Sequence, residues 1–298
     1  MPPECVNPVN GSLVPVLSAA RVLVVAGKGG VGKTTVTAVL ASAAAAAGHR
    51  VLAVELDGKP VLSRLVGDIP LLELSAPAAL EDYLRDHGFG RIAKRLTASG
   101  VIDVVSTAAP GIDDIVVLGK IKQLARTGEW DLIVVDGPAA GHAVTMLTSP
   151  AGMHDAVRGG PVRSQADDVL ELLHDPARCN VVLVTLPETT PVNETIETAF
   201  ALEDRVGVTL GPVIVNAVDV GPAVHAPGDG DRFGDDWAAL VQAAEFRRQR
   251  REMQTAAITR LAEALPLPQL HVPLAAASEL GPDVVTKLAA AVTPGSVR

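Results

Sequence analysis

The sequence predicts an α/β fold: a doubly wound, mostly parallel sheet of about seven or eight strands, flanked by helices and carrying a small helical insertion. Short runs rich in β-branched residues recur along the chain, and a helical pattern lies between nearly every successive pair of them. A chain of 298 residues that is 48 % hydrophobic is also long enough to bury both faces of such a sheet.

The first strand and the turn after it are the most informative stretch. Residues 22–25 form a β-branched run that breaks into a glycine-rich turn from Gly27 to Gly32, and a helix is expected to begin at Lys33. This is a phosphate-binding loop, G-x-x-x-x-G-K-[ST], in its required strand–loop–helix context. The glycines let backbone N–H groups converge on a ligand, and the helix N-terminus adds the positive end of its dipole. The sequence therefore predicts binding of a nucleoside triphosphate such as ATP, together with Mg²⁺.

The residues of this loop have separate expected roles. Lys33 would neutralise the β- and γ-phosphates, and the Thr34 hydroxyl would bind Mg²⁺. An ordinary glycine-rich turn between a strand and a helix is the alternative, and it would leave the lysine and the threonine at these positions unexplained. The predicted phosphate cradle consists of Gly27, Lys28, Gly29, Gly30, Val31, Gly32, Lys33, Thr34 and Thr35.

Two later strands end in acids that are expected beside this loop. Residues 51–55 predict a strand followed by an acid-x-acid pair, Glu55 and Asp57, and residues 130–136 predict a buried strand that ends in Asp136. The carboxyl ends of parallel strands share one edge of the sheet, where α/β proteins bind ligands. Asp136 is therefore expected to hold Mg²⁺, directly or through water. Asp57 is expected in the same crevice; N-capping of the segment that follows is its alternative role, and the two are compatible.

The rest of the chain alternates helices and strands. Residues 60–100 are expected to hold one or two helices. Residues 1–18 predict a flexible lead-in to a single domain over 19–298, and the Gly-, Pro- and Asp-rich stretch 219–235 predicts a loop. Further strands are expected at 101–106, 181–186, 213–215 and 267–273, and further helices at 113–128, 165–173, 191–205, 237–265 and 282–292.

Composition narrows the class of protein. A net charge of −9 disfavours generic nucleic-acid binding. The two cysteines, Cys5 and Cys179, are far apart, which indicates a reducing compartment and no cysteine zinc site. The N-terminal residues lack the basic region of a signal peptide, and the most apolar stretch, 36–47, is too short to span a membrane. We therefore expect a cytoplasmic protein without zinc and without stable nucleic-acid binding.

One further residue of the loop, Lys28, is not required by the general motif. With it, the string Gly-Lys-Gly-Gly-Val-Gly-Lys-Thr-Thr resembles the deviant loop of the ATPase branch that contains ParA, MinD, the nitrogenase iron protein, and the arsenite-pump-driving ATPase ArsA with its tail-anchored-protein-targeting relatives. Residues 110–114 and the predicted switch II at 137–144 resemble the ArsA type in particular. The resemblance implies a Mg²⁺-dependent ATPase that works as a nucleotide-switched dimer, in which Lys28 reaches the partner's nucleotide. A lysine that merely points to solvent is the alternative.

The resemblance also implies roles for individual residues. Asp57 would lie in switch I, orient the attacking water and sense Mg²⁺, so that the implied catalytic residues are Asp57, Lys28 and Lys33. Gly141 of switch II would approach the γ-phosphate. Three residues at strand ends would border the base and ribose of the nucleotide: Glu188, Asn216 and Pro273.

The sequence lacks several features of the proteins that it resembles, and these differences limit which ligands and protein partners are expected. Cys5 and Cys179 cannot supply a cysteine triad for metalloid, and no Cys-x-x-Cys zinc clamp occurs near 219–235. Segments 60–100 and 150–175 would form only a reduced helical subdomain, and the chain has four methionines with which to line a client groove. The sequence thus favours an ArsA-type ATPase, as a homodimer or paired with a paralogous ATPase, coupled to an unidentified hydrophobic client or membrane-protein partner. A ParA- or MinD-like positioning ATPase and a weakly hydrolysing regulatory subunit are the alternatives.

Overall fold

The structure is a computed structural model that describes residues 20–56, 60–86, 111–222 and 236–292. The expectations for the lead-in at 1–18, for Asp57 and for a strand at 101–106 lie outside these residues. Among the helices of the described ranges, none combines the length and the apolar character needed to cross a membrane.

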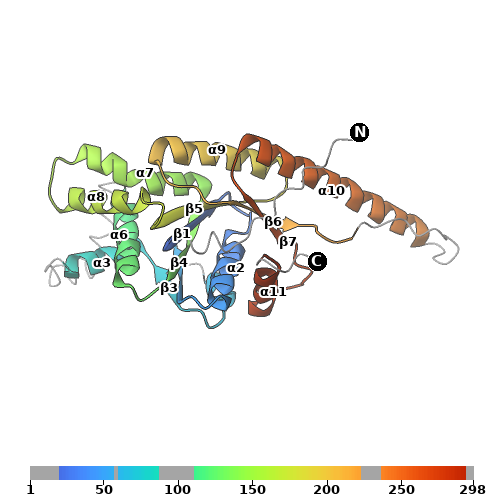
Figure 1. Cartoon of the computed structure of the whole chain (residues 1–298), viewed down its shortest axis with the longest axis horizontal. Helices are drawn as coiled ribbons and strands as arrows, with labels where there is room; N and C mark the ends of the chain where they lie inside the picture. Colours follow the sequence, from blue (N-terminus) through green and yellow to red (C-terminus); the bar gives the residue numbers. More distant parts are fainter. Residues whose placement is uncertain (1–19, 57–59, 87–110, 223–235, 293–298) are drawn as a thin grey trace.

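Seven parallel strands form one sheet in the order β3-β2-β4-β1-β5-β6-β7 (Figure 1). This arrangement confirms the predicted parallel, doubly wound sheet. The central strands are buried along their whole length, as expected when helices cover both faces of a parallel sheet. The strands are β1 (Val22–Gly27), β2 (Val51–Leu56), β3 (Leu71–Leu74), β4 (Leu132–Ala139), β5 (Cys179–Thr185), β6 (Val213–Val218) and β7 (Gln269–Pro273).

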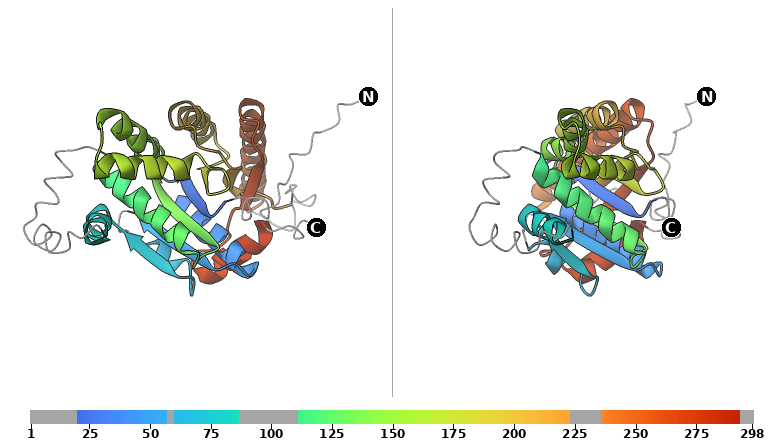
Figure 2. Two further views of the ribbon diagram at one scale, coloured as in Figure 1. Left: turned by 60° about the vertical axis from the view of Figure 1, so that its left-hand side comes forward. Right: turned by 90° about the vertical axis from the view of Figure 1, so that its left-hand side faces the viewer.

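Helices pack on both faces and bury two separate cores. Helices α2 and α11 share one core with one face of the sheet and lie side by side in both views of Figure 2, while α3 and α6 to α10 belong to the other core. Neighbouring residues of a strand alternate between the two cores, as Val134 and Val135 of β4 do. The helices are α2 (Lys33–Ala46), α3 (Ala76–Asp86), α6 (Ile112–Thr127), α7 (Ala140–Ala156), α8 (Pro161–Leu173), α9 (Thr189–Val206), α10 (Trp237–Ala264) and α11 (Pro282–Val292), with a short 3₁₀ helix, η1, at Leu62–Arg64.

The winding of the chain reverses at β1, which lies between β4 and β5. After β1 the chain passes through α2 to β2 and leaves a position in the sheet that β4 later fills. After β4 it passes through α7 and α8, on the opposite face, to β5 on the other side of β1. Such a reversal opens a crevice at the carboxyl ends of the strands, which is where open α/β sheets bind ligands.

One strand departs from the sequence-based expectation. β3 lies inside the stretch 60–100, for which only helices are predicted, and it pairs with β2 at the edge of the sheet. Its four residues are leucines and a glutamate, without the β-branched residues that mark a strand. Pairing with β2, rather than local propensity, therefore makes this segment a strand. Of the helices expected in 60–100, α3 is present, and residues 87–100 lie outside the described ranges.

The long helix α10 is fastened to the end of β6 by two of its arginines. The Arg247 guanidinium donates from Nε and Nη2 to the two carboxylate oxygens of Asp219, each at 2.7 Å. Arg251 donates from Nη1 to the carbonyl oxygen of Gly221 at 2.8 Å. The Arg247 hydrogen bonds lower the pKa of Asp219 to about 2, so this pair stays ionised at neutral pH. These two arginines thus attach α10 to the segment that follows β6.

Candidate nucleotide-binding site

The loop between β1 and α2 folds as an open cradle. Gly30 and Gly32 have φ angles of 85° and 87°, a left-handed conformation that favours glycine. Helix α2 then begins at Lys33 with no side-chain cap and no acidic residue in its first turn. A Cβ atom added at Gly29 or Gly30 would meet no atom within 4 Å, so the loop faces open space there. The uncapped amides of this helix N-terminus fit a phosphate group.

Two close contacts fix the cradle against the sheet. Asn216 of β6 donates from Nδ2 to the carbonyl oxygen of Val31 at 2.9 Å. A Cβ at Gly32 would lie 2.3 Å from the same Nδ2 atom, and a Cβ at Gly27 would lie 2.5 Å from the carbonyl oxygen of Val184 in β5. Gly27 and Gly32 are therefore needed for close approach, and Asn216 is a contact of the loop itself.

Replacing Gly32 with alanine is expected to lower the free energy of unfolding. The left-handed backbone alone costs about 1–2 kcal/mol for a residue with a Cβ, and the new methyl group would displace Asn216 from Val31. Denaturant unfolding measures the loss. Gly30→Ala is the matched control, because it carries the same backbone strain in open space. Equal losses in the two variants would contradict a structural role for the Asn216 contact.

Asp136, at the carboxyl end of β4, contacts the first turns of α2. Its Oδ2 accepts a hydrogen bond from Thr34 Oγ1 at 2.7 Å, and its Oδ1 accepts one from Thr37 Oγ1 at 3.3 Å. Burial raises the pKa of the Asp136 carboxyl, while the two threonine hydroxyls and the charge of Lys33 oppose that rise. The structure thus brings together Thr34 and Asp136, as the sequence predicts. It adds Thr37, which lies three residues along the same helix face and could have been found from that spacing.

Glu55 lies beside Asp136 on the neighbouring strand. The two residues are partners in the β2–β4 register, and Glu55 is 2 % exposed. One carboxylate oxygen, Oε1, accepts hydrogen bonds from the backbone N–H groups of Val61 at 3.3 Å and Leu62 at 3.1 Å. The other, Oε2, is buried without a hydrogen-bond partner among the residues that the structure describes. Two adjacent buried carboxyl groups and a threonine hydroxyl are oxygen donors of the kind that Mg²⁺ prefers.

Lys28 projects from the loop and forms an ion pair with Glu194 of α9. The Lys28 side chain is 53 % exposed and that of Glu194 is 27 % exposed. The backbone carbonyl of Lys28 also accepts a hydrogen bond from Lys33 Nζ at 3.2 Å. Lys28 therefore has a partner within its own chain. Glu194 belongs to no recognisable sequence motif. Its contact with Lys28 depends on the fold and could not be predicted from the sequence. A role for Lys28 across a dimer interface stays a prediction.

The other predicted site residues lie along the same edge of the sheet, and their contacts with nucleotide stay predictions. Thr35 is in the first turn of α2, and Gly141 is in the first turn of α7, exposed and with open space around it. Glu188 immediately precedes α9 and lines a cavity of about 450 Å³ between the start of α9 and α10. Pro273 ends β7 beside the end of β6. Asp57 lies outside the described residues.

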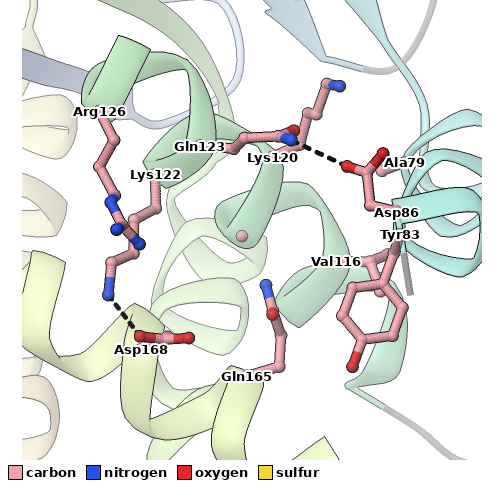
Figure 3. A pocket seen from close by; sticks show the side chains of 11 residues that line it. Ala79, Tyr83, Asp86, Val116, Lys120, Lys122, Gln123, Arg126, Gln165 and Asp168 are labelled. Carbon is pink, nitrogen blue, oxygen red and sulfur yellow. Dashed lines mark hydrogen bonds and ion pairs between the residues drawn. The ribbon is translucent and has the colours of Figure 1, made fainter. Parts of the chain in front are cut away.

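A second cavity, of about 310 Å³, lies among α3, α6 and α8 (Figure 3). Its lining is largely charged or polar. Lys122 is buried and donates from Nζ to Asp168 Oδ1 at 2.8 Å, and Gln123 Nε2 donates to Asp86 Oδ2 at 2.8 Å. This lining differs from the methionine-rich apolar groove that suits a hydrophobic client.

Comparison with known proteins gives a consistent result. Residues 22–228 match the family described as the CobQ/CobB/MinD/ParA nucleotide binding domain. The chain is 33 % identical to the ATPase BagA of Mycobacterium tuberculosis over 225 residues, which are 67 % of this chain and 66 % of that protein. It is 26 % identical to a putative arsenical pump-driving ATPase of Halobacterium salinarum, covering 94 % of this chain and 45 % of that protein. It is 30 % identical to the arsenical pump-driving ATPase of Escherichia coli, covering 65 % of this chain and 34 % of that protein. The chain thus matches just under two thirds of the mycobacterial protein's length and less than half of the other two.

Proposed function

Because this chain belongs to the CobQ/CobB/MinD/ParA nucleotide-binding family, as an ArsA-type member, we propose that it is a Mg²⁺-dependent ATPase that acts as a nucleotide-switched dimer. The observation that carries the proposal is the hydrogen bond between Thr34 and Asp136 beside an uncapped helix N-terminus. This contact supports a phosphate site next to oxygen atoms of the kind that Mg²⁺ prefers.

In the proposed reaction, water attacks the γ-phosphorus in line, the bond between that phosphorus and the bridging oxygen breaks, and ADP leaves. Lys33 and the loop amides would hold the phosphates, and Thr34 with Asp136 would hold Mg²⁺, which neutralises charge on the phosphate oxygens. Asp57 would orient the water. The chain therefore needs to supply position and charge rather than a covalent intermediate.

The dimer in this proposal depends on Lys28 leaving Glu194. Both side chains are partly exposed, and an exposed ion pair of this kind contributes about 0–1 kcal/mol. Transfer of Lys28 to the nucleotide of a partner subunit therefore costs little. We include in the proposal either a second copy or a paralogous ATPase as the partner, and the cytoplasm as the location.

Coupling of hydrolysis to a client or membrane-protein partner is the remaining part of the proposal. It is supported by two relatives whose names say that they drive an arsenical pump. Arsenite itself is not the proposed cargo. Cys179 is fully buried, and burial raises the pKa of its thiol to about 12, so it is not available as a thiolate ligand.

Calorimetry with ATP in the presence of Mg²⁺, combined with light scattering, tests this function. We expect heat of binding, a doubling of mass with ATP and Mg²⁺ but not with ADP, and release of phosphate. The Lys33→Ala variant should lose the binding heat. Absence of heat in the wild-type chain would refute nucleotide binding, and a monomer with ATP bound would refute the homodimer. Binding and dimerisation without phosphate release would indicate a regulatory subunit instead.

A further inference from the structure

One carboxylate oxygen of Glu55 is buried and has no hydrogen-bond partner among the described residues. The residue is 2 % exposed, and the oxygen in question is Oε2. An unsatisfied buried polar atom costs about 1–3 kcal/mol, so buried oxygens of this kind are rare without a reason. The other oxygen is already used by the N–H groups of Val61 and Leu62. Among the described residues the site is thus incomplete, and Oε2 is open to a further hydrogen-bond donor.

The place of Glu55 in the sheet indicates which donor this is. Glu55 and Asp136 are register partners on adjacent parallel strands, which lie about 4.8 Å apart. Two residues before each of them, Ala53 and Val134 belong to the core that the sheet shares with α2. Because side chains alternate along a strand, Glu55 and Asp136 both face α2. Thr34 and Thr37 of α2 contact Asp136 on that face.

We propose that Glu55 is the second carboxylate of the Mg²⁺ centre, with Oε2 accepting hydrogen bonds from water bound to the ion that Thr34 and Asp136 hold. This inference rests on the proposed function. Mg²⁺ in nucleotide sites usually keeps several water molecules and uses one or two carboxylates. A carboxylate that binds those waters orients them and strengthens metal binding. Glu55 acts here as a positioning residue.

The other carboxylate oxygen of Glu55, Oε1, links the proposed metal site to a neighbouring segment of the chain. Oε1 holds the N–H groups of Val61 and Leu62, at the start of η1. A single side chain thus connects the metal centre to the segment that follows β2. Binding of the ion and the position of η1 are coupled through Glu55, and the coupling is reciprocal because it is a difference in binding free energy.

Glu55 could instead serve only to hold η1 in place. The Glu55→Gln variant distinguishes that structural role from a role at the metal site. The amide oxygen of glutamine can still accept the hydrogen bonds of Val61 and Leu62, but an NH₂ group replaces Oε2 and cannot accept one from water. If Glu55 served only to hold η1, glutamine would serve as well. As a positioning residue for the metal, Glu55 loses its function in this variant.

The experiment measures ATP affinity by calorimetry in EDTA and again in Mg²⁺. For Glu55→Gln we expect an unchanged ATP affinity in EDTA. Mg²⁺ should raise the ATP affinity of the wild-type chain, and in the variant this increase should be about 10- to 100-fold smaller. Glu73→Gln is the matched control: Glu73 is the register partner of Glu55 on β3, is exposed, and its replacement removes the same charge. This control should keep the full gain.

Several outcomes would overturn the inference. A Glu55→Gln variant with the wild-type gain from Mg²⁺ would assign Glu55 to the η1 contact alone. Loss of ATP affinity in EDTA as well as in Mg²⁺ would indicate a general disturbance of the fold. If Glu55→Gln does not fold, Glu55→Asp takes its place; the shorter side chain keeps the charge and should show the same selective loss. Failure of the wild-type chain to bind ATP at all would refute the proposed function instead.

Discussion

A chain with Lys28→Ala is expected to bind ATP with nearly unchanged affinity and to hydrolyse it more slowly by roughly three to five orders of magnitude. The phosphates would still be held by Lys33 and the loop amides, whereas the positive charge delivered from the partner subunit to the transition state would be missing. Calorimetry gives the affinity, and phosphate release gives kcat. A loss confined to kcat is the signature of a charge that acts only in the transition state.

Two comparisons make this test specific. Glu194→Gln removes the partner that Lys28 has within its own chain, and turnover should then stay equal or rise because Lys28 is released. Mixing Lys28→Ala with Asp136→Asn chains should restore turnover, since a mixed dimer has one site with an intact metal centre and a lysine from its partner. A mixture that stays inactive, or a Lys28→Ala chain with wild-type kcat, would contradict catalysis across the interface.

The loop and Asp136 were predictable from the sequence for two different physical reasons. The loop motif is local, and the positive φ angle at Gly32 occurs at a position where the motif requires glycine. Asp136 is distant from Thr34 in the chain, but parallel strands bring their carboxyl ends to one edge of the sheet. Recognising the strands was therefore enough to place these two residues together.

Other contacts of the site depend on how the elements pack, and the sequence carries no signal for them. Glu194 meets Lys28 across 166 residues because α9 begins beside the loop. Asn216 is expected near the base or ribose, which stays a prediction; its amide also contacts Val31 in the loop, and the sequence does not indicate that contact. Glu55 was visible only as the first acid of a pair, and its unpaired oxygen becomes apparent only when burial and register are known.

Asp136→Asn is expected to lower kcat on the order of 10²- to 10³-fold, because the variant keeps the shape of the side chain and loses the charge that Mg²⁺ needs. Stability should respond differently. An asparagine can accept from only one of the Thr34 and Thr37 hydroxyls at its single oxygen, which costs about 1 kcal/mol. Removing a buried charge next to Glu55 offsets that cost. Without metal, the free energy of unfolding should therefore be unchanged or higher.

Asp131 lies just before β4, at the opposite end of the strand from Asp136. Asp131→Asn should have the opposite effects on kcat and on stability. Asp131 is partly exposed and accepts hydrogen bonds from Arg50, including one from Nη2 at 2.6 Å, and these hydrogen bonds lower the pKa of its carboxyl. Its replacement should leave kcat unchanged and lower stability slightly. Phosphate release and denaturant unfolding in EDTA, applied to both variants, measure the contrast. If Asp136→Asn loses turnover and stability together, Asp136 supports the fold rather than a metal ion, and the proposed Mg²⁺ centre loses its main ligand.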